Sequence, residues 1–79
     1  MSRTALNNRL AGDFIETVAH EIRKHGGGYN DVLVVLENVI LATMLVGVKS
    51  HRANAQCAVD LADMAMVKAL ERFAREMNK

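Results

Sequence analysis

The sequence predicts an all-α protein: a single domain, residues 1–79, made of three helices over about residues 5–25, 31–49 and 51–77. The residues are 51% hydrophobic but only 4% aromatic, with no proline, which is helix rather than sheet composition. Apolar side chains recur at steps of three and four residues. A chain of 79 residues with one cysteine has a small core and no internal disulfide. We therefore expect an antiparallel helical bundle that is completed by homodimerisation.

The first helix is predicted from a single apolar stripe. Ser2 or Thr4 can cap its start, because hydroxyl side chains accept hydrogen bonds from free amide groups in the first turn. Gly26 follows Arg23-Lys24-His25 and is a normal stop, with cations near the negative helix end. The stripe consists of Leu6, Leu10, Phe14, Val18 and Ile22.

The second helix is predicted after the glycine run 26–28, with Asn30 or Asp31 as its cap. Apolar side chains occupy every sector of this helix, so we expect it to be buried on all sides. Between residues 32 and 48 the only other residues are Glu37, Asn38, Thr43 and Gly47.

The third helix is predicted from about His51, with Ser50 as its cap. A helix from there to residue 76 would run about 40 Å, whereas a compact domain of this size is roughly 30 Å across. One end would therefore overhang a monomeric bundle. Its apolar face consists of Val59, Ala62, Met66, Leu70, Phe73 and Met77.

The dimer interface is expected on the second helix, because neighbours from one chain cover only part of its circumference. Two interpretations of the polar pair Glu37-Asn38 stay open. The pair either belongs to a side-chain network or solvent-facing edge, or Asn38 meets its copy across a two-fold axis and sets the register. The predicted interface residues are Val34, Glu37, Asn38, Leu41, Leu45 and Val48.

No catalytic, cofactor or metal site is predicted. His20 and His25 are five residues apart and diverge by about 140° around a helix, so one helix cannot direct both at one ion. The glycine run lacks the lysine and hydroxyl residue of a phosphate-binding loop. Cys57 has no activating partner within one turn, and we interpret it as a packed thiol. The chain is thus expected not to be an enzyme.

The sequence disfavours two other kinds of partner, nucleic acid and membrane. The net charge of +1 disfavours nucleic acid. The apolar run 32–48, at 17 residues, is at the lower limit for crossing a bilayer, and Glu37 and Asn38 penalise insertion. We expect no membrane association. The alternative of a small DNA-binding regulator would use side chains at the start of the third helix: Ser50, His51, Arg52, Asn54 and Gln56.

The layout of the chain resembles that of a known family. A first helix ending at Lys24-His25, a turn, and an apolar helix with Val35-Leu36-Glu37-Asn38 are similar to the YejL-like family of small uncharacterised bacterial proteins. The resemblance implies a helical homodimer and no particular activity. With no secretory pattern at the N-terminus, we expect a cytoplasmic, non-enzymatic homodimer that binds another macromolecule or serves as an accessory subunit.

Overall fold

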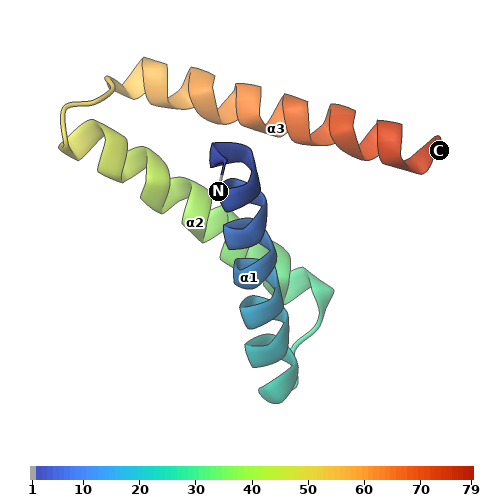
Figure 1. The fold of residues 1–79 in the computed structure, drawn as a ribbon. Helices are drawn as coiled ribbons and strands as arrows, with labels where there is room; N and C mark the ends of the chain where they lie inside the picture. The colour runs from blue at the N-terminus through green and yellow to red at the C-terminus, as the bar shows by residue number, and fades with distance from the viewer. Residues whose placement is uncertain (1) are drawn as a thin grey trace. The chain divides into compact units, whose positions relative to one another are not determined.

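The protein is all-α, with three helices in the part of the chain that the computed structural model describes, residues 2–79 (Figure 1). Helix α1 spans Arg3–Lys24, α2 spans Tyr29–Lys49, and α3 spans Ala55–Met77. The prediction of an all-α chain with three helices is therefore confirmed.

Helix α1 begins two residues and ends one residue earlier than predicted, and its caps are among those that the sequence offers. The Ser2 hydroxyl accepts a hydrogen bond from the Ala5 amide at 3.0 Å, which makes Ser2 the cap. At the other end Gly26 has φ of 80°, and the amides of Gly26 and Gly27 donate to Arg23 and Ile22. This is a Schellman motif, in which a glycine adopts the left-handed conformation at little steric cost.

Helix α2 starts two residues earlier than predicted. The Asp31 carboxylate reaches back and accepts a hydrogen bond from the Gly28 amide at 2.9 Å. An acidic side chain in the first turn that binds the amide preceding the helix forms half of a capping box. Asp31 therefore does stabilise the helix start, but from inside the first turn, and Asn30 is also a helical residue.

Helix α3 starts at Ala55, and the prediction of a start near His51 capped by Ser50 was wrong. The cap is Asn54, whose side-chain oxygen accepts from the Cys57 amide at 2.8 Å. Residues before it close α2 with a second Schellman motif, in which His51 has φ of 59°. Because α3 has 23 residues, it runs about 34 Å, and the overhang expected from a longer helix shrinks.

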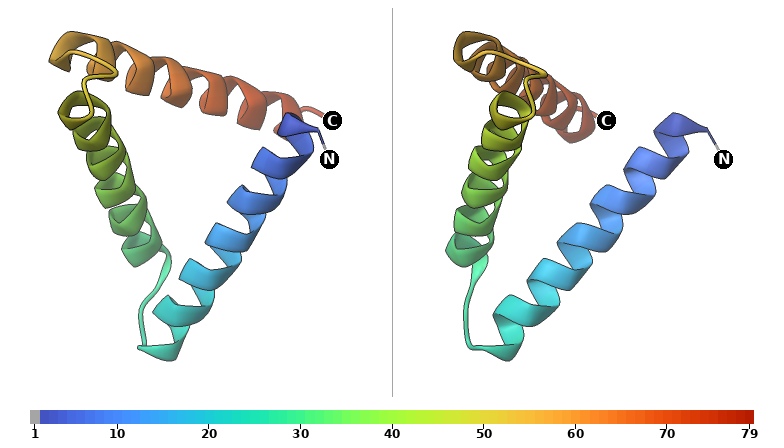
Figure 2. Two further views of the ribbon diagram at one scale, coloured as in Figure 1. Left: turned by 60° about the vertical axis from the view of Figure 1, so that its left-hand side comes forward. Right: turned by 90° about the vertical axis from the view of Figure 1, so that its left-hand side faces the viewer.

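The chain divides into two compact units, Met1–Asn38 and Val39–Lys79, with the boundary inside α2. Figure 2 shows the short turn between α1 and α2 and the irregular segment between α2 and α3. Each unit thus holds one outer helix and half of α2. Units of about 40 residues rarely form a stable core without help.

Side-chain burial within each unit is slight. In the first unit the half-buried residues of the two helices are Val18, Ala19, Ile22, Val32, Val35 and Leu36. In the second unit Ala58 is the one buried residue of the described chain, at 7% exposure. The expectation that α2 is buried on all sides is therefore not met within one chain, because a single neighbouring helix covers one side of it at a time.

Candidate interaction surfaces

Helix α2 is partly covered by its neighbouring helix in each unit. In the second unit the α2 residues that face α3 are Val39, Ile40, Thr43, Met44 and Gly47. In the first unit the half-buried α2 residues are Val32, Val35 and Leu36. The cover that α2 receives is therefore partial in each unit.

The opposite side of α2 is exposed and is called the open face below. It consists of Val34, Asn38, Leu41, Leu45 and Val48, spaced alternately by four and three residues. That spacing matches the a and d positions of a heptad repeat, with Asn38 and Leu45 at a. Val34, Leu41, Leu45 and Val48 are 52%, 54%, 45% and 36% exposed.

The open face contains five of the six residues predicted for the dimer interface. The sixth, Glu37, lies beside it at a heptad g position, where charged side chains commonly flank such a seam. Among the described residues, no hydrogen bond or ion pair involves the side chain of Glu37 or Asn38. The structure thus gathers the predicted residues on one uncovered surface, while the partner of that surface stays a prediction.

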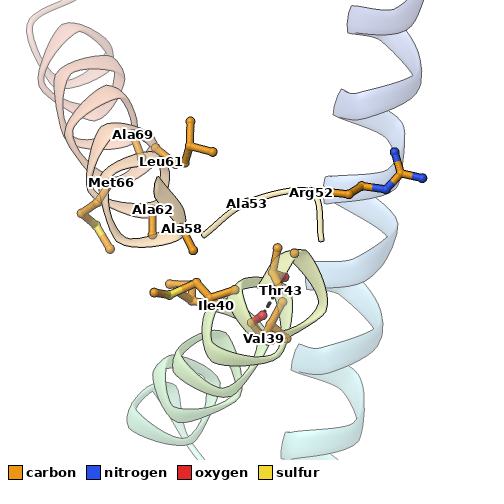
Figure 3. A pocket seen from close by; sticks show the side chains of 13 residues that line it. Val39, Ile40, Thr43, Arg52, Ala53, Ala58, Leu61, Ala62, Met66 and Ala69 are labelled. Carbon is orange, nitrogen blue, oxygen red and sulfur yellow. Dashed lines mark hydrogen bonds between the residues drawn. The ribbon is translucent and has the colours of Figure 1, made fainter. Parts of the chain in front are cut away.

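The second unit also contains an apolar groove between the C-terminal half of α2 and α3 (Figure 3). Its volume is about 550 Å³. On α3 its wall combines Leu61 and Met66 with four small side chains at steps of four, three and four residues, a spacing that allows close approach of another helix. The small side chains are those of Ala58, Ala62, Ala65 and Ala69.

The groove offers few polar groups to a ligand. The Thr43 hydroxyl donates to the Val39 carbonyl of its own helix at 2.7 Å. The Arg52 side chain extends away from the apolar residues (Figure 3). A lining of this kind fits apolar side chains rather than a charged metabolite. Sequence reasoning missed the groove, although the alanine spacing on the third helix was a readable signal.

The side chains proposed to contact DNA have local roles in the structure. Asn54 caps α3, and the Gln56 amide donates to the Asp60 carboxylate at 3.0 Å. The Ser50 hydroxyl donates to the Gly47 carbonyl at 3.3 Å. His51 is placed in the turn, and Arg52 is exposed. Because the third helix starts later than predicted, three of these residues precede it and a fourth is its cap, so only Gln56 lies within the helix.

Side chains with reactive or metal-binding groups are scattered. Within residues 2–79 no three His, Cys, Asp or Glu residues lie close enough to hold one metal ion. His25 lies 3.9 Å from Glu21 on the surface. Cys57 is exposed, so its interpretation as a packed thiol was wrong.

Comparison of the chain with protein-family models, with curated proteins and with solved structures gives no match. The resemblance to the YejL-like family stays a prediction from the sequence pattern.

Proposed function

We propose that this chain is a non-enzymatic helical homodimer that assembles through the open face of α2 and serves as an interaction or accessory subunit. The observation that carries the proposal is the division of α2 into two apolar sides. In the second unit Val39, Ile40 and Thr43 face α3, whereas the open-face residues Val34, Leu41 and Leu45 are 52%, 54% and 45% exposed. Contiguous apolar surface of this kind marks an interaction site.

The energy available from the open face is comparable to the cost of association. Complete burial of a Val or Leu side chain is worth about 1.5–3 kcal/mol. The four apolar residues of the open face are close to half exposed, so each contributes about 1 kcal/mol when covered and eight contribute about 8 kcal/mol per dimer. Association costs about 4–15 kcal/mol. A stable dimer must therefore also cover apolar residues of α1 and α3, such as Leu10, Phe14 and Phe73, which are exposed.

The experiment that tests the proposal is sedimentation equilibrium over a dilution series. Supporting behaviour is twice the chain mass of 8.7 kDa at micromolar concentration. Leu41→Lys on the open face should abolish the dimer and lower the helical circular dichroism, because the lone chain lacks a core. Val46→Lys is the matched control, since Val46 is 66% exposed and lies off the open face. A folded, concentration-independent monomer overturns the proposal.

The lining of the groove fits the proposed interaction role. Its lining combines apolar side chains with a hydroxyl that is bound to its own helix and an arginine that points away. Catalysis needs a nucleophile, base or metal within reach of one bound atom. The groove instead suits the apolar side of a helix, which fits an interaction or accessory role.

Membrane insertion of α2 is the second candidate, and one observation favours it. The helix is long and apolar enough to cross a bilayer by length and composition, and none of the tested window is buried. Its 21 residues span about 31 Å, close to the hydrocarbon thickness. Against it, Glu37 and Asn38 would lie near the bilayer centre, where charged and polar groups are penalised.

Fractionation of cells that make the protein separates the two candidates. The soluble dimer is expected in the supernatant after high-speed centrifugation, in keeping with the proposed cytoplasmic location. Retention of the chain in the membrane pellet after alkaline carbonate washing would favour insertion. Glu37→Leu provides a matched comparison, because it should strengthen retention only if α2 lies in lipid.

A further inference from the structure

We infer that α2 pairs with α2 of a second copy in a parallel, in-register arrangement, and that Asn38 hydrogen-bonds to its own copy and thereby selects this arrangement. The inference rests on the proposed homodimer and adds its orientation, its register and the residue that sets them. Its basis is the position of one amide within the open face.

The open face has the pattern of a dimeric seam. Leu41 occupies a d position, and Val34 and Val48 occupy the neighbouring d positions one heptad away on either side. Leu45 and Asn38 occupy a positions. In this pattern, a single Asn at an a position fixes register and favours two-stranded pairing, at a cost in stability. The seam runs about 21 Å from Val34 to Val48.

The Asn38 side chain is exposed to solvent in the single chain and makes no hydrogen bond to another described residue. Apolar residues flank it on the open face at Val34 and Leu41. When the open face is covered, an amide placed among apolar groups requires a donor and an acceptor. Another carboxamide supplies both, since each has an NH₂ donor and a carbonyl acceptor.

Orientation follows from which residues face one another. In parallel pairing a positions face a positions, so Asn38 meets the same residue of the second copy. In antiparallel pairing a faces d, and Asn38 would face Leu41 with its hydrogen bonds unmade. The structure therefore favours the parallel pair. The side of α2 that carries Val39 and Thr43 stays available for packing within each chain.

Charge exchange at position 38 tests the pairing. Asn38→Asp and Asn38→Lys are prepared with different mass tags, unfolded together, refolded and weighed by native mass spectrometry. We expect each variant alone to dimerise more weakly than the natural chain. In the mixture, the ratio of heterodimer to homodimers should exceed its statistical value by about tenfold or more. Asn30→Asp and Asn30→Lys are the control pair, because Asn30 lies at the start of α2 and off the open face. They should mix statistically.

Disulfide formation tests the orientation. In a Cys57→Ser background, Val34→Cys should cross-link to its copy on mild oxidation, since d positions meet in a parallel pair. An antiparallel pair centred on Asn38 and Leu41 would separate the two thiols by about 16 Å along the axis. Ile40→Cys, on the groove side, is the control that should not cross-link.

The outcomes separate this inference from the homodimer itself. The parallel pair is overturned if the Asn38→Asp and Asn38→Lys chains form dimers in statistical proportions, or if Val34→Cys gives no cross-link. Either result is still compatible with a homodimer. A monomeric natural chain overturns both. Asn38→Leu provides a third test. It should raise the melting temperature, and oligomers larger than the dimer should form beside it, because the amide no longer restricts the arrangement.

Discussion

Truncation of Leu41 is the sharpest test of the open face. Leu41 is 54% exposed and occupies the centre of the seam between Asn38 and Leu45. In the proposed dimer this exposed part is covered by the second copy. Leu41→Ala removes most of the apolar area gained, without adding a charge or a helix-breaking residue.

The magnitude follows from the exposed share. Burial of a whole leucine is worth about 1.5–3 kcal/mol, so covering about half contributes about 1 kcal/mol per chain and about 2 kcal/mol per dimer. A loss of about 2 kcal/mol raises the apparent dissociation constant about thirtyfold. Any cavity left in the seam adds to the loss.

A dilution series followed by helical circular dichroism measures this constant. Val46→Ala is the matched control: Val46 is 66% exposed but lies off the open face, so the constant should change by less than about threefold. Equal effects of the two truncations, or no effect of either, would refute the assignment of the open face as the dimer surface.

Five further measurements follow from the structure. Gly27→Ala should lower the melting temperature by the equivalent of about 1–3 kcal/mol, because the new Cβ would lie 2.7 Å from Ile22 Cγ2 and 2.8 Å from Asp31 Oδ2. Gly12→Ala, with nothing within 4 Å, should raise it. His51→Gly should raise the free energy of unfolding by about 1 kcal/mol, and with it the urea midpoint, since φ of 59° is left-handed; a lower midpoint would contradict the role given to that turn. A chelator should leave the melting curve unchanged, and a drop of several degrees would reveal a ligand set formed between copies. Binding to mixed-sequence duplex DNA should be weak by fluorescence anisotropy at physiological salt; submicromolar binding that Arg52→Ala weakens would instead support the DNA-binding alternative.

The helices were predictable because their signals are local. The stripe from Leu6 to Ile22 fixes one helix, and Gly26 after a cationic turn fixes its end. The start of the third helix was mispredicted because Ser50 and Asn54 are both good caps. The choice depends on His51, which enters a left-handed conformation that sequence preferences disfavour. Only the backbone geometry reveals that the turn continues to Asn54.

The site was predictable in part. The sequence places Val34, Leu41 and Leu45 in one sector of α2, and the structure leaves that sector uncovered. Periodicity alone could not show which side of α2 packs within the chain and which is exposed. The helix is apolar in nearly every direction, so either side could pack against a neighbouring helix. The assignment came from tertiary packing at Ile40 and Thr43. The groove escaped prediction for the same reason, since it depends on how α2 and α3 approach each other.

Slight burial within each unit bears on how the protein assembles. The half-buried side chains of α1 are Val18, Ala19 and Ile22. In α3, Ala58 is buried and Ala62 is half-buried. So few contacts release much less free energy than the ordering of three helices consumes. Folding and association are then one equilibrium in the proposed dimer, and dilution should lose helix content together with mass. Substitutions on the open face would accordingly act on folding itself, so a variant that dissociates while keeping full helicity would show that the single chain holds a core of its own.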